Sequence, residues 1–206
     1  MSAQASPELI LVNPNVELCR AWQSAFDGYP GVAIVHGRFE SLPEFDCMVS
    51  PANSFGLMDG GVDFAITQFF GVQLMERVQA HILREYLGEQ PVGTSFIIET
   101  GHRKHPFLAH TPTMRVPMTI AGTDHVYAAM WAMLLAVHHH NETSPLKIHK
   151  VACPGLGTGT GEVPPDEAAR QMATAYRLYL QPSTVIDWGT ALGRHLMIAG
   201  VGPERR

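Results

Sequence analysis

The sequence predicts a three-layer α/β/α sandwich around a central sheet, and three observations support this fold class. Short apolar runs alternate with longer amphipathic stretches through most of the chain. Loops rich in Gly, Pro and Asn separate these segments. The length of 206 residues and the 46% hydrophobic content are sufficient for one buried core. Strands and helices that alternate in this way pack as helix layers on both faces of a sheet, so we expect a single domain over residues 1–206.

Strands are expected where short apolar runs are bounded by turn residues. Six runs fit this description: 9–12, 32–37, 45–50, 93–100, 107–111 and 148–154. The polar segment GHRKHP between the fourth and fifth runs predicts a hairpin turn.

Helices are expected where apolar residues recur with helical spacing. Four stretches fit: 15–27, 63 to about 88, 123–139 and 164–180. Asn13 or Asn15 can cap the first helix, and Asp166 and Glu167 follow a proline at the first turn of the last one. The fourth helix completes an expected core over about 8–180. It leaves a C-terminal extension, 181–206, whose last residues, GPERR, are expected to form a loose tail.

The charge distribution and the N-terminal sequence limit the kinds of partner. Nineteen acidic residues against 14 basic ones give a formal net charge of -5, and the basic residues are scattered. The sequence has no basic cluster of the kind that binds nucleic acid in general. The start MSAQASPELI has no basic region followed by an apolar one, and no apolar run is long enough to cross a bilayer. We therefore expect a cytoplasmic protein with no membrane partner.

The cysteine and histidine residues do not predict a disulfide framework or a metal centre. Cys19, Cys47 and Cys153 have no CxxC spacing and lie in or beside apolar segments, so we expect buried thiols. Three consecutive histidines at 138–140 would point about 100° apart on a helix and would not converge on one ion. We expect neither a metal nor a cofactor.

Two unusual loops each follow an expected strand and precede an expected helix. The first loop is SPANSFGLMDGGVD at 50–63, and the glycine loop is PGLGTGTGEVPP at 154–165. Loops in this position lie at the carboxyl ends of strands, where open α/β sheets bind ligands. Bare N–H groups near a helix N-terminus form an anion site. Both loops are therefore candidates for binding phosphate, with a flexible turn as the alternative for the glycine loop.

The glycine loop does not match the common nucleotide-binding motifs. It lacks the GK[ST] ending of a P-loop, and its glycines occupy every second position instead of the GxGxxG order. Alternating glycines suit a loop wrapped around a phosphate, with the hydroxyls of Thr158 and Thr160 as additional donors.

Asn53 and Asp63 stand at opposite ends of a GLMDGG bend in the first loop. An Asn amide can orient a sugar hydroxyl or a water molecule, and an Asp carboxylate can accept a proton or hold that water. Each residue also has a structural interpretation, because Asn in a turn often bonds its own backbone and Asp at a helix start is often an N-cap.

The two loops together resemble the signatures of macro domains, which bind ADP-ribose. SPANSFGLMDGGVDFAI is similar to the family's NAANSSLLGGGGVDGAI, without a gap from Asn53 to Asp63. ACPGLGTGTGEVPPDEAA is similar to the second signature, a strand that ends in PAISTGIYGYP, and AHTPTMR falls where the family has an HTVGP-like strand end. The resemblance covers roughly residues 8–180 and implies a mixed central sheet with ADP-ribose across the strand ends.

The resemblance also implies which residues form the site. In the hydrolytic branch, residues that match Asn53 and Asp63 are held responsible for removing ADP-ribose from a protein carboxylate or for opening O-acetyl-ADP-ribose, a reaction that needs no metal. The implied ligand-binding residues are Phe39, Ser54, Gly60, Gly61, Val62, Phe64, Gly155, Gly157, Thr158, Gly159, Thr160 and Gly161. The implied partner is ADP-ribose or an ADP-ribosylated macromolecule. A reader module without catalysis and a phosphatase on ADP-ribose 1''-phosphate are the alternatives.

This sequence departs from the family pattern at several positions. Ser50 replaces the first Asn of NAAN, Met58 and Asp59 replace part of the glycine run, and Phe64 replaces a glycine. Arg38 occupies the place of an Asp that commonly reads adenine. Arginine only donates hydrogen bonds, although its plane can stack on the ring, so adenine recognition is expected to be altered or relocated. The backbone N–H of Phe39 can still serve, and Glu40 or Asn13 can replace the carboxylate.

Overall fold

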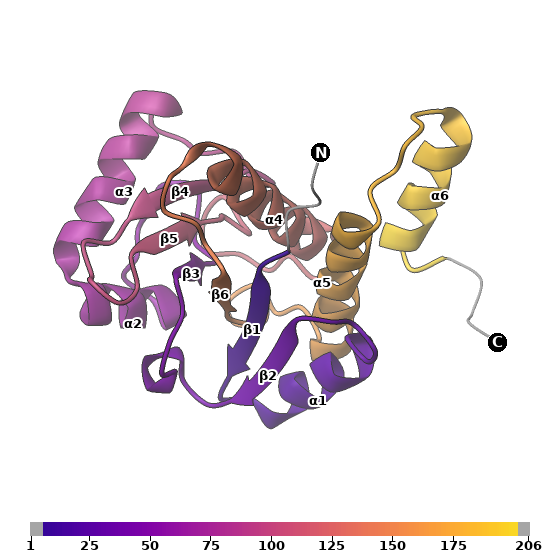
Figure 1. Cartoon of the computed structure of the whole chain (residues 1–206), viewed down its shortest axis with the longest axis horizontal. Helices are drawn as coiled ribbons and strands as arrows, with labels where there is room; N and C mark the ends of the chain where they lie inside the picture. Colours follow the sequence, from indigo (N-terminus) through magenta and orange to yellow (C-terminus); the bar gives the residue numbers. More distant parts are fainter. Residues whose placement is uncertain (1–5, 202–206) are drawn as a thin grey trace.

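The computed structural model describes residues 6–201, and its centre is a six-stranded mixed sheet (Figure 1). The strands are β1 (Glu8–Asn13), β2 (Val32–His36), β3 (Cys47–Ser50), β4 (Phe96–Glu99), β5 (Phe107–His110) and β6 (Lys150–Cys153). They lie in the order β2-β1-β6-β3-β5-β4. All the pairings are parallel except the hairpin of β4 with β5. The six predicted strands, the predicted hairpin and the mixed sheet are therefore confirmed.

Helices cover both faces of the sheet, as the predicted three-layer sandwich requires. They are α1 (Val16–Ala25), α2 (Gly61–Phe70), α3 (Val72–Glu85), α4 (His125–Thr143), α5 (Pro165–Leu180) and α6 (Trp188–Ile198), with a 3-10 turn, η1 (Phe39–Ser41). Asn15 caps α1, because its Oδ1 accepts hydrogen bonds from the N–H groups of Glu17 and Leu18. Asn13 instead accepts from the N–H of Asn15.

Alternation of side chains along the strands divides the core into two halves. Leu9 and Leu11 of β1 pack into the cluster that includes α1, α4 and α5. Ile10 and Val12 point to the opposite face and pack with α2, α3 and η1. The three cysteines are buried, as predicted, and burial raises the pKa of each thiol.

The helical pattern predicted from residue 63 to about 88 is two helices, not one. Gly71 lies between α2 and α3 with a φ of 93°, a left-handed conformation that glycine adopts readily and other residues do not. The interruption turns α3 away from α2, and both helices still pack on the same half of the core.

The C-terminal extension contains α6, which the sequence analysis did not predict. It lies beyond α5 and away from the sheet, and none of its residues is buried (Figure 1). The guanidinium of Arg170 donates to the carbonyl oxygens of Met197 (3.0 Å) and Ile198 (2.8 Å) at its C-terminal end. The segment GPERR, predicted to be a loose tail, lies outside the described residues. Within residues 6–201, no helix combines the length and apolar character needed to cross a membrane.

The parallel strands bring three loops together at one edge of the sheet. β1, β6 and β3 are adjacent, so the loops that follow Asn13, Cys153 and Ser50 start side by side. β5 pairs with β3 in register, and its end at His110 lies beside Ser50. Ligands bind at this edge in open α/β sheets.

Candidate functional site

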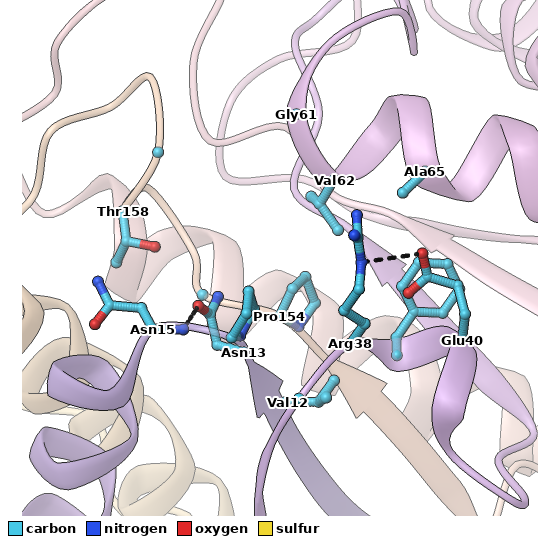
Figure 2. Close-up of a pocket in the computed structure, with 15 residues that line it drawn as sticks. Val12, Asn13, Asn15, Arg38, Glu40, Gly61, Val62, Ala65, Pro154 and Thr158 are labelled. Carbon is cyan, nitrogen blue, oxygen red and sulfur yellow. Dashed lines mark hydrogen bonds and ion pairs between the residues drawn. The ribbon is translucent and has the colours of Figure 1, made fainter.

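Two adjoining cavities lie at the carboxyl ends of the strands. The larger cavity, of about 310 Å³, lies over the ends of β1 and β2, and Figure 2 shows the residues around it. The smaller cavity, of about 150 Å³, lies over the end of β3 and is bordered by both predicted loops. Four residues line both cavities: Gly61, Val62, Gly155 and Gly159. The cavities therefore form one continuous cleft, with the first loop and the glycine loop as its walls.

The glycine loop presents a row of backbone donors to this cleft. Within the described part of the chain, no protein acceptor pairs with any N–H group from Gly155 to Gly161. The loop is fixed through other atoms, because the carbonyl of Gly157 accepts from the N–H of Val163 (3.0 Å) and that of Gly161 accepts from the N–H of Ile120 (2.9 Å). Free N–H groups held in a fixed loop form an anion-binding surface.

Close packing explains two of the glycines in the loop. A Cβ at Gly155 would lie 2.5 Å from a methyl group of Leu18, and a Cβ at Gly161 would lie 2.5 Å from the carbonyl oxygen of Gly157. At Gly159, by contrast, a Cβ would meet nothing within 4 Å. Packing therefore does not require a glycine at position 159. The missing side chain leaves the backbone of the loop open to the cleft.

The first loop reaches the cleft through the N-terminus of α2. Gly60 is the N-cap, and the N–H groups of Gly61 and Val62 in the first turn have no carbonyl one turn earlier to pair with. The helix dipole adds partial positive charge at the same point. Met58, two residues before the cap, is fully buried in the core, and its carbonyl accepts from the hydroxyl of Thr67 at 2.9 Å. It anchors the loop and does not face the cleft.

Asn53 borders the smaller cavity, but its side chain is bonded to its own loop. Its Oδ1 accepts from the N–H groups of Phe55 (3.1 Å) and Leu57 (3.3 Å), and its Nδ2 donates to the carbonyl of Leu57 (2.8 Å). These bonds match the structural interpretation of an Asn in a turn. Asn53 braces the loop that leads to α2.

Asp63 is the titratable group of the smaller cavity with the most perturbed environment. Its side chain is buried on α2, and its Oδ1 accepts a 2.6 Å hydrogen bond from the hydroxyl of Ser50. Burial raises the pKa of Asp63 to about 7, although the hydrogen bond from Ser50 opposes the shift. A carboxyl group with a pKa near neutrality can both take up and release a proton under physiological conditions.

The structure brings most of the predicted site residues together along the cleft. Phe39 and Thr158 line the larger cavity; Asn53, Gly60, Asp63, Gly157, Thr160 and Gly161 line the smaller one; and Gly61, Val62, Gly155 and Gly159 line both. The two remaining residues, Ser54 and Phe64, lie outside these cavities.

Ser54 is a buried residue of the first loop, and its backbone joins a buried polar network. Its carbonyl accepts from the N–H of Gln90 (2.9 Å), and the side chain of Gln90 accepts a 2.6 Å hydrogen bond from Nδ1 of His110. Burial lowers the pKa of His110 to about 3, so this ring is neutral. Phe64 is 51% exposed and contributes to a shallow groove on the outer face of α2, beside Gln68.

Several residues of the cleft were missed in the sequence analysis. They include Val12, Asn15, Ala65, Thr113, Met114, Pro117 and Pro154. The loop after β5 supplies three of them, and Met114 forms a parallel bridge with Asn53. The sequence analysis noted the segment AHTPTMR for its likeness to a family strand end but assigned none of its residues to the site, although the rule of a polar loop at the carboxyl end of a strand applies to it as well.

Comparison with known protein sequences places the chain in a family. The family model described as Macro domain matches residues 49–172, which is more than half of the chain. An uncharacterized protein from Aquifex aeolicus (strain VF5) is 32% identical over 149 residues, covering 72% of this chain and 82% of the relative. A macro domain-containing protein in gbd 3'region from Cupriavidus necator is 30% identical over 156 residues, covering 75% and 84%. The chain therefore belongs to the macro domain family.

Solved macrodomain structures share the fold. The Oceanobacillus iheyensis macrodomain with ADP superimposes with a TM-score of 0.59 at 23% identity, covering 71% of this chain and 75% of that chain. A variant of the same macrodomain with ADPR gives 0.60 at 20% identity, covering 87% and 82%. The macrodomain of Mycobacterium tuberculosis DarG gives 0.53 at 18% identity, covering 65% and 82%.

Proposed function

We propose that the protein binds ADP-ribose in the cleft, with the diphosphate between the first loop and the glycine loop. The observation that supports this most directly is the row of unpaired N–H groups from Gly155 to Gly161, which faces the N-terminus of α2 across a shared cavity. A diphosphate is bound by several hydrogen-bond donors and is repelled by nearby carboxylates. Backbone N–H groups supply such donors. The larger cavity would hold the base, and the smaller one the distal ribose. Ligands in the names of the related structures, ADP and ADPR, agree with this assignment.

Asp63 supports a further proposal, hydrolysis of the ester bond that links the ribose of ADP-ribose to a carboxyl group of its target. In this reaction a water oxygen attacks the ester carbonyl carbon while the Asp63 carboxylate takes the proton from the water. The bond to the ribose oxygen then breaks, and that oxygen takes up a proton. A base with a pKa near 7 is suited to this step, because it is ionised in a large fraction of molecules and still holds a transferred proton.

The alternative is a reader that binds ADP-ribose without cleaving it, and Asn53 favours this alternative. Both lone pairs of its Oδ1 and one of the two Nδ2 N–H groups are used within the first loop, so only a single N–H is left to contact a water molecule. A hydrolysis assay separates the two proposals. Release of ADP-ribose from an ester-linked substrate that is lost in Asp63→Asn indicates catalysis, and binding without release indicates a reader.

The binding proposal is tested by isothermal titration calorimetry with ADP-ribose on the wild type and on Gly159→Val. The added side chain would meet no protein atom at its Cβ and would project into the cleft, so we expect binding to be lost while the ligand-free melting temperature changes little. Gly193→Val, on α6 with equally open surroundings, is the matched control and should bind as the wild type does. The proposal fails if the wild type gives no heat, or if Gly159→Val binds normally.

A further inference from the structure

The larger cavity has the walls and the depth to hold a nucleobase. Apolar side chains of Val12, Val62 and Ala65 border it from two sides, together with the ring of Pro154 (Figure 2). Its volume of about 310 Å³ leaves room for a planar ring system. Arg38 extends along one side toward Val62, and Figure 2 shows its guanidinium beside the carboxylate of Glu40.

The free polar groups of this cavity are mostly hydrogen-bond donors. Oδ1 of Asn13 is occupied by the N–H of Asn15 at 2.9 Å, and Oδ1 of Asn15 by the N–H of Glu17 at 2.8 Å. Oδ1 of Asn15 also accepts from the N–H of Leu18 at 3.3 Å and is filled, whereas Oδ1 of Asn13 keeps one lone pair; both amides offer their Nδ2 groups to a ligand as donors. Arg38 adds up to five N–H donors on a side chain that is 73% exposed. The larger cavity thus favours a base that presents acceptors.

Glu40 supplies the carboxylate acceptor of the cavity, and it lies directly beside the arginine. Its Oε1 is 3.6 Å from Nε of Arg38, and its side chain is about one-third exposed. The pair therefore presents donors followed by an acceptor along one edge of the cavity. An exposed pair at this distance is weak, so it can open to accept a ligand.

Guanine has the matching order of groups along its edge. N7 and O6 are adjacent acceptors that a guanidinium can bind in a bidentate manner, and the N1–H and 2-amino groups that follow are donors for a carboxylate. Adenine places its amino group beside N7, so the same guanidinium would meet a donor. Adenine can still occupy the cavity through its apolar walls and through N7 alone.

We propose that Arg38 and Glu40 make the base end of the cleft accept guanine, so that GDP binds at least as tightly as ADP. This inference rests on the proposed function, because it takes the nucleoside diphosphate to lie in the cleft. Arg38 makes the contact with O6 and N7 of the base, and Glu40 makes the contact with N1–H and the 2-amino group.

Calorimetric titration with GDP, ADP and IDP tests the inference, since inosine keeps O6 and N7 but lacks the 2-amino group. Arg38→Met keeps the apolar stem and removes the donors, and because the position is exposed we expect the variant to fold as the wild type does. We expect this variant to weaken GDP and IDP by about tenfold and ADP by less than about threefold. Glu40→Gln keeps only a neutral acceptor oxygen and is expected to reduce the preference of the wild type for GDP over IDP. Arg103→Met, on an exposed turn remote from the larger cavity, removes the same charge and is the matched control.

The outcomes separate this inference from the proposed function. If neither ADP nor GDP binds, the proposed function fails as well. If ADP binds the wild type more tightly than GDP does, or if Arg38→Met weakens ADP and GDP equally, guanine acceptance is wrong while binding in the cleft stands. If Arg103→Met has the effect of Arg38→Met, the effect is general electrostatic attraction and the inference is also wrong.

Discussion

The buried carboxyl of Asp63 makes the stability of the protein depend on pH near neutrality. Its pKa is raised from 3.8 to about 7 in the folded state, chiefly by burial. The protonated form is therefore favoured by folding, and the stability that this contributes is fully present below pH 3.8 and is lost as the pH rises through about 7. Asp63→Asn replaces the carboxyl with a neutral group of the same shape that can still accept from Ser50, so it removes this pH dependence.

The expected size of the effect follows from the pKa shift. A shift of this extent corresponds to at most about 4 kcal/mol of unfolding free energy. Because the carboxyl borders a cavity that is open to solvent, we expect about 2–4 kcal/mol. The free energy of unfolding of Asp63→Asn, relative to the wild type, should rise by this amount between pH 4 and pH 8.

Urea unfolding followed by tryptophan fluorescence at a series of pH values measures the difference. Asp59→Asn, an exposed carboxylate in the same loop, is the control and should show no such rise. A constant difference between Asp63→Asn and the wild type from pH 4 to pH 8 would refute the raised pKa. It would also remove the reason for proposing Asp63 as the base. If Asp63 is the base, the hydrolysis rate of Asp63→Asn should be at least about 100-fold below that of the wild type.

Three further substitutions test the cleft and the hydrogen bonds that support it. Ser50→Ala removes the hydrogen bond that opposes the shift of Asp63, so the midpoint of the pH-dependent stability should move up by about one pH unit, as measured by the same unfolding series. Asp59→Asn removes a negative charge from the lining of the smaller cavity, and calorimetry should show ADP binding about threefold tighter at low salt, with the gain vanishing at high salt. Gln171→Met leaves the buried N–H of Tyr127 without its acceptor and should lower the free energy of unfolding by about 2 kcal/mol in urea.

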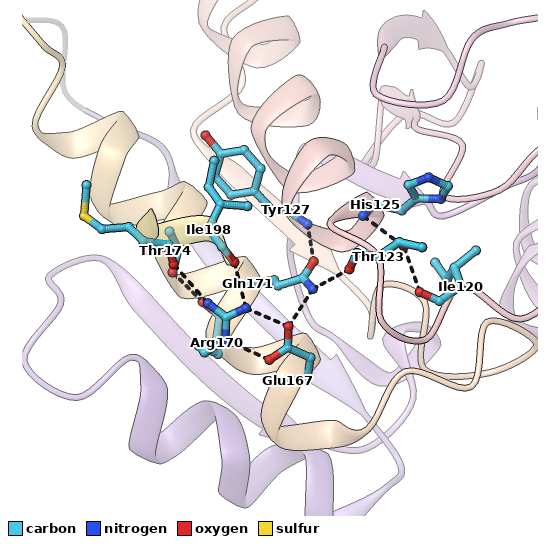
Figure 3. A network of polar contacts seen from close by, with 10 residues as sticks. Ile120, Thr123, His125, Tyr127, Glu167, Arg170, Gln171, Thr174 and Ile198 are labelled. Carbon is cyan, nitrogen blue, oxygen red and sulfur yellow. Dashed lines mark hydrogen bonds and ion pairs between the residues drawn. The ribbon is translucent and has the colours of Figure 1, made fainter. Parts of the chain in front are cut away.

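The last of these substitutions acts at a junction between the glycine loop and the C-terminal extension. Gln171 donates to the carbonyl of Thr123 and to Glu167, and Glu167 is paired with Arg170, which holds the end of α6 (Figure 3). Ile120, whose N–H holds the glycine loop, accepts from the hydroxyl of Thr123. The network fixes the start of α4 and, through it, the turn against which the glycine loop rests.

Local patterns were sufficient to predict the strands and the position of the two loops. The apolar runs at 9–12 and 148–154 form strands that are buried on both faces, and such strands appear in the sequence as short continuous apolar runs. The break at Gly71 was missed because a glycine inside a helical pattern is often tolerated, and only its φ distinguishes a break from a continuous helix. α6 was missed because no buried face gives it a periodic pattern. Arg170 of α5 holds the carbonyls at its C-terminal end, and its own Arg194 donates to the hydroxyl of Tyr127 on α4.

The site was harder to predict than the fold, because its chemistry depends on partners distant in sequence. The spacing of Asn53 and Asp63 predicts that both reach the cleft, and both do. The spacing does not show which side-chain atoms are already hydrogen-bonded within the protein, and the two residues differ in this respect. Asn53 bonds to its own loop, whereas Asp63 accepts a hydrogen bond from Ser50, which lies thirteen residues earlier on a strand.

The positions that depart from the family pattern have different consequences for the cleft. Met58 fills the core and leaves the backbone donors of α2 in place, so it need not impair phosphate binding. Ser50 supports Asp63 with a hydrogen bond, and Phe64 lies on the outer face of α2. Asp59 alone adds a negative charge to the wall where a diphosphate would lie. The departures therefore keep the buried carboxyl of Asp63 and add a negative charge to the cleft, and the pH series and the salt dependence of ADP binding address these two properties separately.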